Sequence, residues 1–124
     1  VWGVETAGAD AMSRALAAGR AVQLEAVTSL AATLGAPAVS PLTLDLAQRH
    51  VEEVVLVPDR EAVADLLWLL DRVKVLTEPA AACTIGAARR LRDRLGPDSH
   101  VVIVLCGASV TLDEVAAFRA QVGL

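Results

Sequence analysis

Apolar residues along the chain follow two periods, and each change of period marks a predicted element. Short apolar stretches at residues 1–5, 52–58 and 100–106 are typical of β-strands. The last of these is apolar without interruption from Val101 up to Cys106. A strand with no polar position has no face toward water, which is typical of a parallel sheet covered by helices on both sides. The pattern therefore predicts buried parallel strands.

The segments between these strands carry helical periodicity or capping signals. One predicted helix has apolar residues at i, i+3, i+4, i+7 and i+10, a spacing that gathers them on one face toward a sheet. These residues are Val63, Leu66, Leu67, Leu70 and Val73. The other predicted helices are 9–19 closed by Gly19, 40–50 opened by Ser40 and Pro41, 79–95 stopped before Gly96 and Pro97, and a last helix opened by the capping box Thr111–Glu114.

Two stretches between the first helix and residue 40 carry less regular patterns. Residues 21–27 are strand-like, and residues 28–37 predict a helical turn broken by Gly35 and Pro37. Strands that alternate with helices predict a three-layer α/β unit with a largely parallel sheet. No internal repeat or linker interrupts the chain, so we expect one structural unit.

Composition narrows the class of protein. Of the 124 residues, 55% are hydrophobic and the mean hydropathy is +0.53, yet no stretch approaches the roughly 18 apolar residues of a membrane span. A net charge of −4 does not indicate the positively charged surface with which proteins bind nucleic acids. The basic cluster, Arg89, Arg90, Arg92 and Arg94, predicts a solvated helix face rather than a phosphate patch. We therefore expect a protein without a nucleic-acid or membrane partner that hides apolar surface against another segment.

Side chains for catalysis are sparse. Cys83 and Cys106 form neither a metal spacing nor a disulfide framework, which favours a reducing cytoplasm. No glycine-rich phosphate loop is present, and His50 and His100 stand without a recognisable nucleophile. Lys74 is the only lysine. From the residues alone the chain predicts a binding module without a visible catalyst.

Cys106 has two interpretations, which the residues by themselves leave open. Ligands bind at the carboxyl ends of parallel strands, and Cys106 ends the predicted strand 100–106 immediately before Gly107. Free cysteine is also among the most buried residue types and often only packs.

Four segments in register resemble one enzyme family. They are VWGVETAGADA (1–11), TSLAATLGAPAV (28–39), LTEPAAACTIGAA (76–88) and VVIVLCGAS (101–109). Their order and spacing resemble the carboxyl-terminal part of the pyridoxal-phosphate enzymes of the tryptophan synthase β superfamily, or fold type II. Within it they resemble the serine/threonine dehydratases of the liver type. The resemblance covers essentially the whole chain.

The resemblance implies that residues 1–124 are the carboxyl-terminal portion of a pyridoxal-phosphate-binding catalytic domain, within the large domain of the enzyme. Enzymes of this family eliminate water from serine or threonine to give a 2-oxo acid and ammonia. Their Schiff-base lysine and phosphate loop lie in an amino-terminal half, the partner this chain would need for activity. A homodimer is also implied. A serine racemase, a threonine synthase or a non-catalytic α/β ligand-binding or regulatory module are the alternatives.

The resemblance also assigns cofactor contacts. The residue at the Cys106 position hydrogen-bonds the pyridine nitrogen, followed by Gly107, and Glu78 approaches the ring edge. A neutral thiol leaves the ring a weaker electron sink than a carboxylate would, which suits elimination. Without the resemblance, Glu78 at a helix start predicts capping or a helix-dipole contact. Relatives commonly carry Gly-Gly-Asn where this chain has Gly107, Ala108 and Ser109, so we expect a changed local turn.

A cation site is the last implication of the resemblance. Its ligands are the Glu5 carboxylate and the carbonyls of Ala9, Leu34 and Ala36, and hard cations prefer such oxygens. Some relatives add an acidic residue where this chain has Ala11. One carboxylate with neutral carbonyls favours K⁺ or Na⁺ over Mg²⁺. The alternative is that Glu5 is only a strand-end carboxylate.

Overall fold

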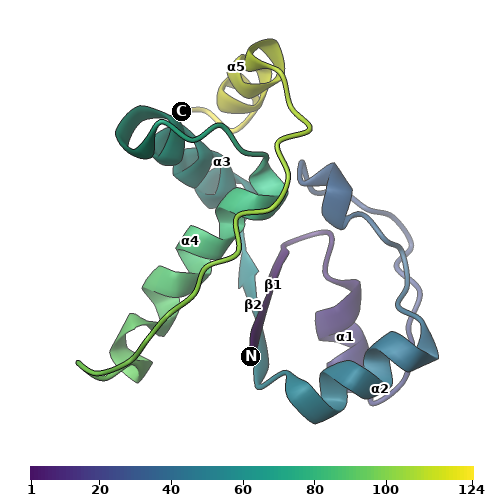
Figure 1. The fold of residues 1–124 in the computed structure, drawn as a ribbon. Helices are drawn as coiled ribbons and strands as arrows, with labels where there is room; N and C mark the ends of the chain where they lie inside the picture. Colours follow the sequence, from purple (N-terminus) through teal and green to yellow (C-terminus); the bar gives the residue numbers. More distant parts are fainter.

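The computed structural model describes all 124 residues as a parallel two-stranded sheet with helices on both faces (Figure 1). The strands β1 (Trp2–Thr6) and β2 (Glu53–Val57) pair with Val4 opposite Val55. The helices are α1 (Ala11–Ala18), α2 (Pro41–His50), α3 (Asp59–Trp68), α4 (Pro79–Leu91) and α5 (Leu112–Gln121), with short turns η1 (Ala32–Leu34), η2 (Leu69–Val73) and η3 (Arg92–Arg94). None of these helices is long and apolar enough to span a bilayer.

The elements form three layers, as the alternation of strands and helices predicts. Helix α4 packs on both strands, and α3 packs along α4 on the same side of the sheet. Helices α1 and α2 lie on the opposite side (Figure 1). Helix α5 packs on α3, and its Val115 lies in one buried cluster with Leu66, Leu69 and Ala82. The predicted α/β class with a parallel sheet is confirmed.

The capping signals in the sequence are confirmed as contacts. Gly19 ends α1 in the left-handed region with φ of 64°. The Ser40 hydroxyl accepts a hydrogen bond of 3.1 Å from the Thr43 amide at the start of α2. Thr111 and Glu114 form the reciprocal capping box of α5. Local hydrogen bonds of this kind depend only on neighbouring residues, so the sequence predicts them directly.

The arginine cluster lies on the surface and makes ion pairs to neighbouring elements. Arg89 pairs with Asp65 and Arg90 with Glu61, which joins α4 to α3, and Arg94 pairs with Glu53 of β2. All four arginine side chains remain exposed, from 39% at Arg90 to 85% at Arg92, so the expected solvated face is confirmed. The ion pairs to elements distant in sequence were not predicted.

Helix α4 approaches α3 closely at Gly86. A Cβ atom built at Gly86 would lie 2.7 Å from Glu61 Oε1 and 3.1 Å from both Asp65 Oδ2 and Val57 Cγ1. The Asp65 side chain is only 1% exposed and its Oδ2 has no hydrogen-bond partner. The absence of a side chain at Gly86 thus permits the contact that fixes α4 against the sheet and α3.

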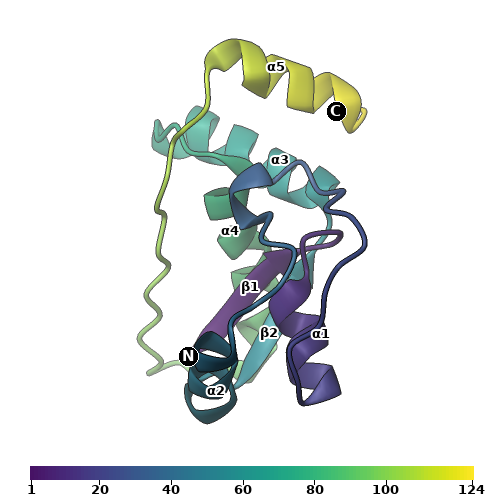
Figure 2. The same ribbon diagram turned by 90° about the vertical axis from the view of Figure 1, so that its right-hand side faces the viewer.

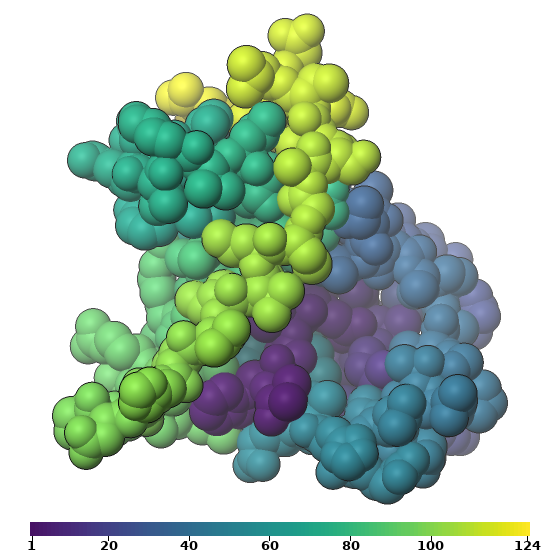
Figure 3. Space-filling model, in the orientation of Figure 1, coloured from purple at the N-terminus to yellow at the C-terminus, as the bar shows by residue number.

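The predicted buried strand 100–106 is wrong for this chain. The segment forms no strand, and Val101 to Leu105 are all exposed, Val102 to 87%. It runs as an extended ribbon beside the body of the fold (Figure 2) and forms a ridge on one face of the molecule (Figure 3). The physical reason is that a strand needs a neighbour to pair with, and residues 100–106 make no backbone hydrogen bond to β1 or β2.

Three further expectations are only partly met. Residues 21–27 contribute a single isolated bridge, Gln23 with Ala38, instead of a strand. The predicted turn at 28–37 shrinks to the one 3-10 turn η1. The predicted helix with the apolar stripe ends at Trp68 and continues as a π-helical turn, so Val73 is 49% exposed.

Asp65 predicts a pH dependence of folding. Burial raises the pKa of the Asp65 carboxyl above its ordinary value of 3.8, and the hydrogen bond and charge of Arg89 oppose this only in part. The folded state then holds this proton more tightly than the unfolded state, so the stability gained by protonation is lost as pH rises through the folded pKa. We expect Asp65→Asn to gain unfolding free energy relative to the native chain as pH rises from about 3.8, then to level off.

Urea unfolding of the protein that carries this chain, repeated across pH, measures that difference. Asp98→Asn is the control, because Asp98 is exposed and makes no ion pair. A difference that falls as pH rises would mean that the attraction of Arg89 outweighs burial.

Candidate functional site

Cys106 is exposed and makes no hydrogen bond to the rest of the chain. Among the 124 residues it is Cys83 that packs in the core, whereas the cofactor role of Cys106 stays a prediction. Cys83 is fully buried in the cluster between α4 and β2, where burial raises the pKa of its thiol to about 11. Such a thiol stays protonated and unreactive at neutral pH. Of the two cysteines, only Cys106 is available to a ligand.

Glu78 and Gly107 lie together, as expected for two residues of one site. The Glu78 amide donates to the Gly107 carbonyl over 3.3 Å, and the Thr77 hydroxyl donates to the same carbonyl over 2.7 Å. The Glu78 carboxylate, from a residue only 8% exposed, accepts from the Ser109 amide over 3.2 Å. These bonds place the turn that follows Cys106 at the first residues of α4.

Gly107 is required by its conformation and by its surroundings. Its φ is +92°, a region that residues with a side chain rarely adopt. A Cβ atom there would lie 2.6 Å from Glu78 Oε1. Ala108, which replaces the second glycine of the relatives, has no positive φ and is exposed, so its methyl group is accommodated. The turn needs one glycine, and the sequence supplies it at Gly107.

The loop 28–36 reaches the same end of the sheet and is anchored there by polar contacts. Ser29 donates to Asp59 Oδ1 over 2.5 Å and lies 2.7 Å from the hydroxyl of Thr6, the last residue of β1. The Leu30 amide donates to Asp59 Oδ2 over 2.8 Å. Further along the loop, the Thr33 hydroxyl donates to Glu78 Oε1 over 2.8 Å. The loop thus connects the carboxyl end of the sheet with the Glu78 carboxylate.

Sequence reasoning missed Thr33, Thr77 and Ser109 as members of this site. Thr33 is 45 residues from Glu78 and Ser109 is 31 residues away. The only available signal was local, since Thr77 directly precedes the glutamate of the TEPA stretch. A single threonine in an alanine-rich loop carries no pattern that predicts a distant partner.

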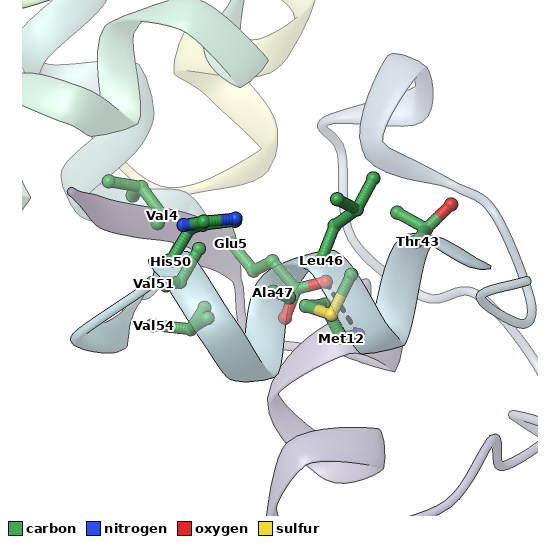
Figure 4. A pocket seen from close by; sticks show the side chains of 10 residues that line it. Val4, Glu5, Met12, Thr43, Leu46, Ala47, His50, Val51 and Val54 are labelled. Atoms are coloured by element: carbon green, nitrogen blue, oxygen red, sulfur yellow. Dashed lines mark hydrogen bonds between the residues drawn. The ribbon is translucent and has the colours of Figure 1, made fainter. Parts of the chain in front are cut away.

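Both carboxylate oxygens of Glu5 accept hydrogen bonds from backbone amides at the start of α1. Oε1 accepts from the Met12 amide over 2.9 Å and Oε2 from the Ser13 amide over 2.8 Å. Figure 4 shows the carboxylate turned toward Met12 at the edge of a mostly apolar hollow of about 370 Å³ between β1 and α2. Burial raises the pKa of Glu5, the two amides oppose this, and the charge of Asp10 adds to it. In this structure Glu5 caps a helix.

The other three candidate cation ligands lie on two neighbouring loops. Ala9 follows β1, and the Thr28 amide donates to the carbonyl of the adjacent Gly8 over 3.0 Å, which joins the two loops. The Leu34 carbonyl already accepts from the Ala36 amide over 2.9 Å. No group of three or more His, Cys, Asp or Glu side chains is placed to hold a metal ion. The cation site at Glu5, Ala9, Leu34 and Ala36 stays a prediction.

The described geometry presents Cys106 at the surface beside the turn that Thr77 and Glu78 hold. Cys106 offers a ligand an exposed neutral thiol. Sulfur is a poor hydrogen-bonding atom, so the thiol would hold a ligand more by contact than by a strong bond. No nucleophile and base pair is present beside it.

Comparison with known proteins identifies the family of the chain. The family model described as "Pyridoxal-phosphate dependent enzyme" matches residues 1–107. The phenylserine dehydratase of Ralstonia pickettii is 35% identical over 100% of this chain and 37% of its own length. The serine dehydratase-like protein of Rattus norvegicus is 39% identical over 95% of this chain and 39% of its own length. The chain thus spans well under half the length of these relatives.

Solved structures also resemble the chain in fold. The L-serine ammonia-lyase of Rhizomucor miehei superposes with a TM-score of 0.81 at 29% identity, over 98% of this chain and 40% of that protein. A threonine deaminase from Solanum lycopersicum has the same fold, with a TM-score of 0.86 at 24% identity over 98% of this chain and 34% of that one. The chain described here belongs to the family of pyridoxal-phosphate-dependent enzymes.

Proposed function

We propose that this chain is the carboxyl-terminal portion of the catalytic domain of a longer enzyme that deaminates L-serine or L-threonine. The observation that carries the proposal is the match to serine dehydratases at 35 to 39% identity over nearly the whole chain. In the proposed reaction the amino acid loses its Cα proton and its β-hydroxyl as water. The released enamine regains that water on hydrolysis, so serine yields pyruvate and ammonia with no net water.

In this proposal the residues at the Cys106 turn would contact the pyridoxal phosphate ring. Bound pyridoxal phosphate supplies an electron sink that weakens the bonds at the Cα atom of the amino acid. Cys106 would face the ring nitrogen, because its thiol is exposed and has no partner within the chain. A thiol is neutral, so it does not hold that nitrogen protonated as a carboxylate would. This contact suits elimination, which needs the sink only until the β-hydroxyl leaves.

Glu78 is the second proposed cofactor residue, at the ring edge. Its carboxylate is buried, makes no side-chain bond to the start of α4 and forms no ion pair with a lysine or arginine. Capping therefore does not explain its burial. A buried carboxylate without a cationic partner is costly to fold around, which supports a role beyond packing.

The wider assembly belongs to the proposal as well. The amino-terminal half would supply the Schiff-base lysine and the phosphate loop, and we expect a homodimer in the cytoplasm. Racemisation is the second candidate reaction, because the serine racemase of Dictyostelium discoideum superposes with a TM-score of 0.78 at 26% identity.

Cys106→Ala tests the cofactor contact. In the full-length protein supplied with pyridoxal phosphate and L-serine, we expect pyruvate formation to fall by up to about fivefold, because an ordinary hydrogen bond is worth about 1 kcal/mol and a thiol forms a weaker one. Urea unfolding of the variant checks that a loss of turnover is not a loss of folding. Cys106→Ser keeps a neutral hydrogen-bonding group and should retain most of the activity, whereas Cys106→Asp should change the balance of products.

Three results would contradict parts of this proposal. Unchanged turnover in Cys106→Ala would remove the role of Cys106. A native protein that forms no pyruvate would remove the dehydratase function. Formation of D-serine without pyruvate would identify the racemase alternative.

Glu5→Ala separates helix capping from cation binding. Loss of the two amide contacts should lower the unfolding free energy by about 1 kcal/mol, whether or not K⁺ is present. If the proposed cation site exists, the native protein should also gain stability on changing from tetramethylammonium to potassium chloride, and the variant should not. Urea unfolding in the two salts measures both effects.

Glu52→Ala is the matched control, since Glu52 is exposed and forms no ion pair. A native protein that is equally stable in both salts contradicts the cation site. An equal loss in Glu5→Ala and Glu52→Ala contradicts the cap.

A further inference from the structure

The carboxylate of Glu78 accepts hydrogen bonds from two segments that make no hydrogen bond to each other. Oε1 accepts from the Thr33 hydroxyl over 2.8 Å, and Oε2 accepts from the Ser109 amide over 3.2 Å. Thr33 lies in η1 of the loop 28–36, and Ser109 lies three residues after Cys106. Glu78 begins α4, yet its side chain turns away from that helix and makes no capping bond. Its carboxylate is thus used to connect segments rather than to start a helix.

The segment 100–109 depends on this connection. Apart from a local bond from the Val110 amide to the Ala108 carbonyl, its hydrogen bonds to the rest of the chain go to Thr77 and Glu78: two to the Gly107 carbonyl and one from the Ser109 amide. None of the side chains from Val101 to Leu105 belongs to a buried cluster, although Ile103 and Leu105 are only 38% and 39% exposed. The position of Cys106 is therefore determined by the contacts made immediately after it.

The charge of the Glu78 carboxylate makes its hydrogen bonds strong. It also makes them sensitive to the loss of either donor. A hydrogen bond to a carboxylate is about twice as strong as one between neutral groups. Thr33 and Ser109 are the donors to the buried Glu78 carboxylate, and no cation compensates it. Removal of one donor leaves a desolvated oxygen without a partner, which draws in water and loosens the other contact.

We propose that Thr33, Glu78 and Ser109 form a clamp that positions Cys106, so that Thr33 is a positioning residue for the cofactor site. The loop 28–36 is itself fixed to the end of the sheet by Ser29 and Asp59. Through the clamp, that rigid anchor extends to the turn at Gly107. The positioning role rests on the proposed function, whereas the existence of the clamp does not.

Thr33→Val tests the clamp, because valine keeps the shape of threonine and removes the hydroxyl donor. Hydrogen exchange of the full-length protein reports on the Ser109 amide, which we expect to exchange about fivefold faster in the variant. The dissociation constant for pyridoxal phosphate should rise by a similar factor. Thr33→Ser restores the donor and should return both values to those of the native protein.

Thr28→Val is the matched control, because Thr28 lies in the same loop and its hydroxyl makes no hydrogen bond. Unchanged exchange at Ser109 in Thr33→Val, or an equal change in Thr28→Val, overturns the clamp. Faster exchange with unaltered cofactor affinity overturns the positioning role and leaves the clamp as a structural contact. A native protein that binds no pyridoxal phosphate removes the positioning role together with the proposed function, and the exchange rates still decide whether the clamp exists.

Discussion

One buried carboxylate holds the candidate site together. Glu78 receives donors from a loop 45 residues earlier in the chain and from a turn 31 residues later, and its own amide holds the Gly107 carbonyl. Without the Glu78 side chain, the turn after Cys106 loses the Ser109 contact and keeps the two hydrogen bonds to the Gly107 carbonyl. A single anionic group can do this because each carboxylate oxygen accepts strong hydrogen bonds from neutral donors when water is excluded.

The packing of α4 against α3 and β2 fixes the position of Glu78 at the start of α4. Gly86 lets α4 lie close to α3 and β2, and the pairs Asp65–Arg89 and Glu61–Arg90 join α3 to α4 beside that contact. Burial of the Asp65 carboxylate costs more free energy than its ion pair with Arg89 returns, so this arrangement lowers the stability of the fold at neutral pH. The start of α4 is thereby fixed at the carboxyl end of the sheet, the edge at which ligands of α/β proteins bind.

Features set by neighbouring residues were predictable from the sequence, and features set by distant partners were not. The Ser40 cap, the Thr111–Glu114 box and the left-handed Gly19 depend on local chemistry, and all are present. The strand predicted at 100–106 is absent, since apolar residues alone form no strand without a neighbour to pair with. The closeness of Glu78 and Gly107 was expected from a family resemblance, but the Thr33 contact was not, because one threonine carries no sequence signal.

An experimental structure of the full-length protein with pyridoxal phosphate bound measures the central claim most directly. The contact proposed for the thiol requires Cys106 Sγ within about 4 Å of the ring nitrogen, with the Glu78 carboxylate still bonded to Thr33 and Ser109. A ring nitrogen that faces another side chain, with Cys106 pointing into solvent, would contradict it.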